Sequence, residues 1–222
     1  MEVVDKIHLV DRIGYSNVFL IVDKGLTLID TGMPKNGKKI LEYISNLGFA
    51  PSDLKRIIIT HYHPDHIGSL FEVWSETNAE IFVHRIDSPY VSGKKKIPYP
   101  KGSKGILYRF LGLFMKFKFV ESNKPLKDGD TIDNFKVIHT PGHTPGHICL
   151  YNPKRKILFS ADMFKVEKGE IKPMDESFID NKDELEKSLV KISKLNFDTI
   201  CPGHGEFVKS GGKALLEKYL KK

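Results

Sequence analysis

Cysteine is scarce in this chain and long hydrophobic runs are missing, and each shortage excludes a class of protein. The 222 residues include two cysteines, Cys149 and Cys201, which give no disulfide framework and suit a reducing compartment. No apolar run reaches the length that spans a membrane, and the first residues, MEVVDKIHLV, are too charged for a secretory signal. We therefore expect a cytoplasmic protein with no membrane span.

Two other features are missing: the strand–turn–helix motif of a serine nucleophile and a linker that would divide the chain into domains. A chain of this length is ample for one substantial core. We predict a single domain over residues 1–222, with an insertion at 88–125 where a Lys-, Gly- and Pro-rich stretch precedes an apolar helix.

The charge balance is basic but does not by itself indicate a nucleic-acid partner. Lys and Arg number 35 against 28 Asp and Glu, which gives a net charge of +7, and we interpret the basic residues as spread along the chain. Such a balance is more often a solvated surface than a nucleic-acid site. We expect a small-molecule substrate, with nucleic acid as the weaker alternative.

Hydrophobic patterning indicates strands and helices that alternate in the first half and a more strand-rich second half. The predicted strands cover residues 7–13, 17–32, 55–60, 80–84, 131–140, 147–162 and 198–204. The predicted helices cover residues 34–48, 67–74, 181–195 and 212–222. Two β-rich halves with helices outside them predict a layered α/β sandwich.

Metal-capable side chains are concentrated in HYHPDH, residues 61–66, directly after a predicted buried strand. His61 and His63 lie two residues apart, so that both imidazoles can face one point from an extended backbone. Asp65 and His66 follow where the chain turns into the next helix, and they can address a second point. Four such residues with a change of chain direction suit two metal ions better than one.

Three further candidates follow later strands, at His143, Asp162 and His204. Polar side chains at strand ends, on loops held by a rigid scaffold, are typical of active sites. Three histidines make a catalytic zinc set with an open position, and a carboxylate can bridge two ions. With five histidines and two aspartates, the candidates suffice for two ions.

From LIDTG at 28–32 to PGHG at 202–205, these motifs resemble the metallo-β-lactamase superfamily, and HTPGHTPGH at 139–147 most resembles its glyoxalase II and lactonase branch. The resemblance implies a four-layer αβ/βα sandwich of two mixed β-sheets, with helices on the outer faces. It also implies a ligand set: His61, His63 and His143 on one metal, Asp65, His66 and His204 on the other, and Asp162 bridging them. A hydroxide between the ions would attack the substrate, and Asp65 would be the catalytic residue facing it.

The remaining candidates receive supporting roles. We expect Asp30 to orient a ligand or brace its loop, and His139 and His147 to support the ligands without binding metal. We expect His84 to be a structural residue at the end of a strand.

The expected reaction is therefore metal-dependent hydrolysis of an ester-like bond, in an acyl thioester or a lactone. The expected cofactors are two divalent ions, zinc by default with iron or manganese as alternatives. The alternative functions are a metal-dependent phosphodiesterase or nuclease and an iron-dependent oxidoreductase of the same fold.

The insertion at 88–125 keeps several interpretations open. Leu107, Phe110, Leu111 and Phe114 repeat at helical spacing and predict an apolar helix too short to span a bilayer. The helix can pack on its own domain, act as a lid over an apolar substrate, or form a homodimer contact. A membrane-surface anchor is a further, less favoured interpretation.

Overall fold

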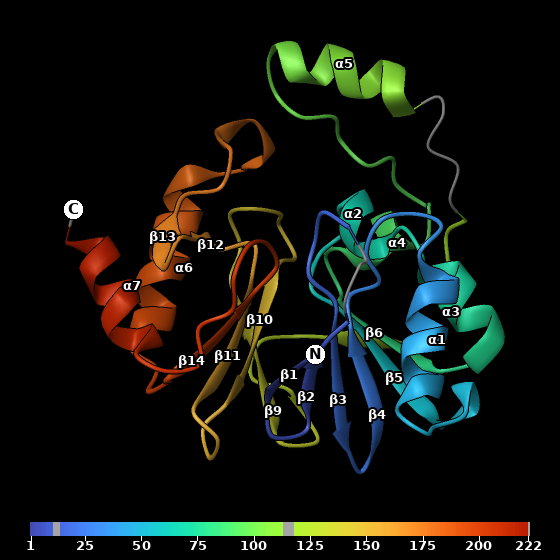
Figure 1. Ribbon diagram of the computed structural model, residues 1–222. Coiled ribbons are helices and arrows are strands. Elements are labelled where there is room, and N and C mark those ends of the chain that lie inside the picture. The colour runs from blue at the N-terminus through green and yellow to red at the C-terminus, as the bar shows by residue number, and fades with distance from the viewer. Residues whose placement is uncertain (11–13, 113–117, 222) are drawn as a thin grey trace. The chain divides into compact units, whose positions relative to one another are not determined.

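The structure is a computed structural model that describes residues 1–10, 14–112 and 118–221 (Figure 1). The chain forms two compact units, the first comprising Met1–Pro125 with Glu176–Phe178 and the second comprising Leu126–Asp175 with Ile179–Lys222. Each unit has one large sheet and its own helices. The grouping of both units into a single domain stays a prediction.

A seven-stranded mixed sheet organises the first unit, and its strand order follows the chain. The strands are β1 (Glu2–Val4), β2 (Ile7–Leu9), β3 (Phe19–Asp23), β4 (Gly25–Ile29), β5 (Leu54–Ile59), β6 (Glu80–His84) and β7 (Lys124–Leu126). Strands β1 to β4 pair antiparallel, whereas β4, β5 and β6 pair in parallel. Parallel pairing brings the carboxyl ends of β4 and β5 to the same edge of the sheet.

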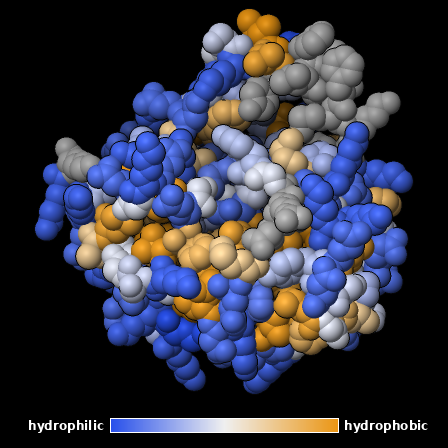
Figure 2. Space-filling model, in the orientation of Figure 1, coloured by the Kyte–Doolittle hydropathy of each residue, from blue (hydrophilic) through white to orange (hydrophobic). Residues whose placement is uncertain are grey.

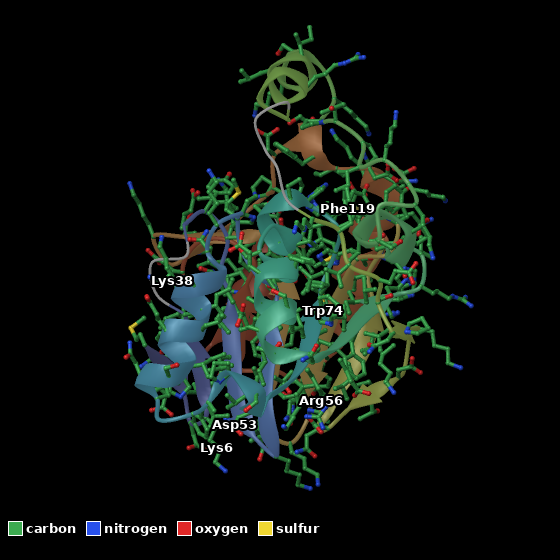
Figure 3. All side chains as sticks on the ribbon, turned by 90° about the vertical axis from the view of Figure 1, so that its right-hand side faces the viewer. Lys6, Lys38, Asp53, Arg56, Trp74 and Phe119 are labelled. Atoms are coloured by element: carbon green, nitrogen blue, oxygen red, sulfur yellow. The ribbon has the colours of Figure 1, made fainter. Side chains whose placement is uncertain are left out.

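Two helices, α1 (Gly37–Asn46) and α3 (Leu70–Thr77), cover one face of this sheet (Figures 1 and 3). Helix α1 buries Ile40 and Ile44 in a core cluster that also contains strand residues such as Leu28 and Ile57. Its apolar residues at i and i+4 therefore produce the face that packs on the sheet. Figure 3 shows Trp74 on α3, and its partly buried side chain packs against the same cluster.

The predicted helix at 67–74 is interrupted. A short helix, α2 (Pro64–Ile67), ends before Gly68, and α3 starts at Leu70. At the interruption the Gly68 N–H donates outside the helix, to the Gly32 carbonyl at 3.0 Å, and only glycine fits there because a Cβ on Gly68 would lie 2.4 Å from Pro34. The chain at Gly68 is thus held against the loop that follows β4.

The second unit contains a five-stranded sheet with the order β14-β11-β10-β9-β8. Its strands are β8 (Thr131–Ile132), β9 (Phe135–His139), β10 (Ile148–Asn152), β11 (Ile157–Ala161) and β14 (Thr199–Pro202). Only the β11–β14 pair is parallel among the pairs of this sheet in the described part of the chain. Two mixed sheets with helices confirm the predicted α/β class.

Helices α6 (Lys182–Ser193) and α7 (Gly212–Leu220) lie on one face of this second sheet (Figure 1). Leu189 and Ile192 of α6 and Leu216 of α7 share a buried cluster with Leu158 and Ile200. The sequence predicted both helices but not the short hairpin of β12 (Lys165–Glu167) and β13 (Glu170–Lys172).

The insertion begins with α4 (Ser88–Val91) and continues to α5 (Ser103–Gly112). The predicted apolar helix thus starts earlier than expected, and residues 113–117 of that prediction lie outside the described residues. Among the described residues, no helix is long and apolar enough to cross a membrane.

Candidate metal centre

The HYHPDH motif follows β5 and holds two imidazoles, those of His61 and His63, edge to face with ring centroids 4.8 Å apart. His61 is fully buried, and its Nε2 lies 3.2 Å from Nδ1 of His63. Two nitrogens bound to one tetrahedral zinc at about 2.0–2.1 Å are separated by about 3.3 Å. The spacing of the two imidazole nitrogens therefore fits neighbouring ligands of a single ion.

Asp65 and His66 form the second pair of this loop, at the start of α2. Pro64 occupies the first turn of α2, where its missing N–H costs no hydrogen bond. The Oδ2 atom of Asp65 lies 3.7 Å from Nε2 of the buried His66. The rings of His61 and His66 are 4.1 Å apart, so both pairs belong to one compact group.

Asp30 determines which nitrogen of His61 and His66 carries a proton. Its buried carboxylate accepts the Thr60 N–H at Oδ1 and the Thr60 hydroxyl at Oδ2, both at 2.8 Å. The hydroxyl has one proton, so its contact of 3.0 Å with His61 Nδ1 requires that nitrogen to donate. His66 Nδ1 lies 2.8 Å from the same carboxylate and donates to it. Both histidines are left with an Nε2 lone pair, the form that binds metal.

Two hydroxyl residues hold this loop in place. The Thr31 N–H and hydroxyl both donate to the His66 carbonyl, at 2.8 and 2.9 Å. The Ser16 hydroxyl donates to the Asp65 carbonyl. Neither these two residues nor Thr60 could be predicted from the sequence, because serine and threonine are common and no spacing distinguishes them. Asp30, in contrast, has the supporting role that we predicted.

In the second unit, Asp162 and His204 follow β11 and β14. Because these strands are parallel and pair Ala161 with Pro202, the two side chains leave the same edge of the sheet. The Oδ2 atom of Asp162 lies 3.3 Å from His143 Nε2 and 3.2 Å from His204 Nε2. One carboxylate oxygen between two imidazole nitrogens is the arrangement expected of a bridging ligand.

His147 supports Asp162, as predicted. Its Nε2 accepts the backbone N–H of Asp162 at 3.1 Å, so its Nδ1 donates to the Thr140 hydroxyl at 2.9 Å. His139 has a similar supporting contact, since its Nε2 lies 2.9 Å from the Pro145 carbonyl.

The loop that carries His143 depends on Gly142. The backbone there has φ +134°, and an added Cβ would lie 2.3 Å from the backbone nitrogen of Leu185 in α6. The Gly142 carbonyl also accepts the N–H of Asn181, the N-cap of α6, at 2.9 Å. Only glycine permits this close approach of the loop to the helix.

The two cysteines lie outside the metal-capable groups that the described residues form. Burial raises the pKa of the Cys149 thiol to about 12 and raises the pKa of the Cys201 thiol still further. Neither thiol is ionised near neutral pH, and a thiolate is the form that binds metal or attacks substrates. The metal-capable groups are therefore imidazoles and carboxylates, which suit divalent zinc, iron or manganese.

A family model described as the metallo-β-lactamase superfamily matches residues 11–204. The probable metallo-hydrolase YflN of Bacillus subtilis is 29% identical over 196 residues, which cover 80% of this chain and 74% of the relative. A hydroxyacylglutathione hydrolase of Pelagibacter ubique is 27% identical over 199 residues, which cover 88% of this chain and 68% of the relative. The solved structure of TTHA1623 in a di-iron-bound form gives a TM-score of 0.67 at 27% identity, covering 87% of this chain and 89% of that one.

Proposed function

Because the chain belongs to the metallo-β-lactamase superfamily, we propose that it hydrolyses an acyl thioester or a lactone with two divalent ions. Family membership and the histidine and aspartate groups make the chain a metal-binding hydrolase. The number of ions, their identity, their ligands and the substrate are the proposal. The observation that carries it is the spacing of donor atoms, 3.2–3.7 Å within each unit, which suits ligands that share an ion.

The proposed ligand sets draw on both units of the chain. The first ion takes His61, His63 and His143, the second takes Asp65, His66 and His204, and Asp162 bridges them. Zinc is the proposed metal. Iron is the principal alternative, since TTHA1623 was solved in a di-iron form at 27% identity to this chain.

The proposed roles follow from what each side chain contacts. A divalent ion lowers the pKa of a bound water toward about 7 and so supplies a nucleophile at neutral pH. Asp30 and Thr60 hold the ligand tautomers of His61 and His66. The Asp65 side chain is 19% exposed, whereas that of His66 is fully buried, so of these two proposed ligands Asp65 is the one that a bound substrate can reach.

Two observations support an acyl substrate. One is the hydroxyacylglutathione hydrolase of Pelagibacter ubique, a thioester-cleaving relative by its name. The other is the apolar surroundings of His63, whose ring centroid lies 5.2 Å from that of Tyr62 and 6.0 Å from that of Phe178. Aromatic rings beside the proposed reaction centre suit an acyl arm better than a bare phosphodiester.

Metal analysis of the purified chain, followed by a substrate panel, tests this proposal. We expect two equivalents of zinc or iron, loss of activity on chelation, and turnover of acyl thioesters or lactones in preference to β-lactams and phosphodiesters. Preferred phosphodiester cleavage would replace the proposed substrate by the nuclease alternative. An activity that consumes oxygen would contradict hydrolysis itself.

Asp65→Asn separates the proposed catalytic role from a structural one. The amide keeps the size of the side chain but loses the charge, so we expect kcat to fall by a factor on the order of 10² to 10⁴ while the fold persists. Asp23→Asn, at an exposed position that ends β3, is the matched control. Normal kcat in Asp65→Asn would remove Asp65 from the mechanism.

A further inference from the structure

Basic residues are spread along the chain, as expected, but its net positive charge arises in one segment that lacks acidic residues. Between Asp87 and Glu121 the sequence contains eight Lys and Arg and no Asp or Glu. Removing these eight from the 35 basic residues leaves 27 against 28 acidic residues. The rest of the chain is therefore almost neutral, at −1, and residues 88–120, here termed the basic segment, account for the whole net charge of +7.

The basic segment also exposes large hydrophobic side chains. Ile106 and Leu107 of α5 are 77% and 54% exposed, and Tyr99 and Phe119 are 53% and 46% exposed. Figure 2 shows hydrophobic surface at α5, at the top of the view. Helix α5 also exposes Lys104 and Arg109, so its surface is apolar and cationic together. This combination is typical of helices that lie in a membrane interface.

We propose that the described part of the basic segment, residues 88–112 and 118–120, binds the surface of an anionic lipid bilayer. Lysine and arginine are attracted to the negative surface potential, and Ile106 and Leu107 enter the boundary between head groups and acyl chains. The exposed cations that carry the attraction are Lys95, Lys96, Lys101, Lys104 and Arg109. Lys94 contributes less, because it forms an ion pair with Glu121 at 2.5 Å.

Other partners fit these features less well. A polynucleotide would be attracted by the charge and could stack its bases on Tyr99 and Phe119, but it would leave the aliphatic side chains of Ile106 and Leu107 exposed to water. A second copy of the chain meeting this one through the same surface would bring two strongly cationic segments together, and like charges oppose such an interface. A bilayer satisfies both the cationic and the aliphatic groups.

Contacts within the first unit connect the basic segment to the HYHPDH loop. Tyr90 of α4 stacks on Tyr62 with ring centroids 4.3 Å apart and an interplanar angle of 28°. Farther along, the Lys101 N–H donates to the Ser177 carbonyl at 2.8 Å, and the neighbouring Phe178 contacts the ring of His63. A bilayer bound at the basic segment would thus lie next to the HYHPDH loop, which holds four of the proposed metal ligands.

Vesicle flotation of the full-length chain tests the proposal without any assay of turnover. We expect binding to phosphatidylcholine vesicles that contain about 30% phosphatidylglycerol, weak binding to pure phosphatidylcholine, and loss of binding as salt is raised. Equal binding to both kinds of vesicle, or binding to neither, would overturn the proposal.

Charge variants examine the cationic contribution. Lys95→Gln, Lys96→Gln and Lys104→Gln together should weaken binding to the anionic vesicles about 100-fold, because each cation near the surface contributes about a factor of five. The matched control replaces three exposed lysines of the second unit, Lys154→Gln, Lys194→Gln and Lys218→Gln, and should change binding less than about threefold. Equal losses in both triple variants would mean that net charge alone, and not the basic segment, causes binding.

Aliphatic variants distinguish insertion from simple attraction. Ile106→Ser with Leu107→Ser should weaken binding at least about tenfold, since burial of each side chain is favourable. The control pair, Val190→Ser with Leu220→Ser, removes two exposed aliphatic side chains of α6 and α7 and should have little effect. Far-UV circular dichroism and thermal unfolding establish that every variant is folded.

Two alternative results would also refute the lipid proposal. One is binding to single-stranded RNA, abolished by the lysine variant, in a chain that does not float with vesicles. The other is a dimer in sedimentation equilibrium that Ile106→Ser with Leu107→Ser dissociates, again without vesicle binding.

Discussion

Asp30→Asn tests the hydrogen bonds that Thr60 and His66 donate to Asp30, here termed the Asp30 relay, which hold the histidines of the HYHPDH loop in the tautomers that bind metal. The amide oxygen can still accept the Thr60 N–H, as Asp30 Oδ1 does at 2.8 Å. The amide nitrogen, in place of Oδ2, would face two donors, the Thr60 hydroxyl and His66 Nδ1, each now 2.8 Å from that position. Two hydrogen bonds to a buried charge are lost, and each contributes about 1.5–3 kcal/mol.

The Thr60 hydroxyl can rotate and the His66 proton can move to Nε2, and both adjustments recover part of this loss. We therefore expect the free energy of unfolding of the metal-free protein to fall by about 2–4 kcal/mol. A proton on Nε2 removes the lone pair with which His66 binds metal, so we expect metal affinity to fall about 10- to 100-fold. Urea unfolding of the metal-free protein and competition with a chromophoric chelator measure the two quantities.

Asp23→Asn is the matched control, because Asp23 is exposed and ends a strand of the same sheet. The relay would be refuted if Asp30→Asn bound zinc with wild-type affinity. Loss of stability with unchanged affinity would reduce Asp30 to a brace for the loop and would contradict its control of the His66 tautomer.

Two further predictions concern the second unit. Gly142→Ala should lower the free energy of unfolding by at least about 3 kcal/mol, because an L-residue at φ +134° is strained and its Cβ would meet Leu185. The control Gly129→Ala, with φ +85° and no atom within 4 Å of the added Cβ, should lower it by about 1–2 kcal/mol. If urea unfolding showed the same loss of unfolding free energy for both variants, the close approach of Gly142 to α6 would not contribute to stability. Because burial raises the pKa of Cys149 to about 12 and that of Cys201 further, neither thiol should react with a disulfide reagent at pH 8 until the chain is unfolded, and rapid modification of the native protein would contradict this burial.

Local patterns predicted most strands and helices because their signals are short-range. The DKG turn between β3 and β4 and the apolar spacing in α1 are examples that the structure confirms. The break at Gly68 was not predictable, because its N–H donates to the carbonyl of Gly32, which is distant in the sequence. The β12–β13 hairpin was missed because its strands have three residues each, too few for an alternating pattern.

The candidate ligands were proposed from the sequence for a different reason, and their assignment stays a prediction. Histidine and aspartate at strand ends are rare enough in combination to identify a site, and the resemblance to a family added the assignment to two ions. The relay of Asp30 through Thr60 was not predictable beyond a supporting role for Asp30. It depends on the parallel pairing of β4 and β5, which places the residues after the two strands side by side.

The position of Trp74 makes the two units distinguishable by spectroscopy. It is the single tryptophan of the chain, and it packs on the core of the first unit (Figure 3). Its fluorescence therefore reports unfolding of that unit, whereas far-UV circular dichroism reports helices and strands of both. Coincident curves in urea would mean that the units lose their structure in one cooperative transition, and separated curves would mean that each has its own stability.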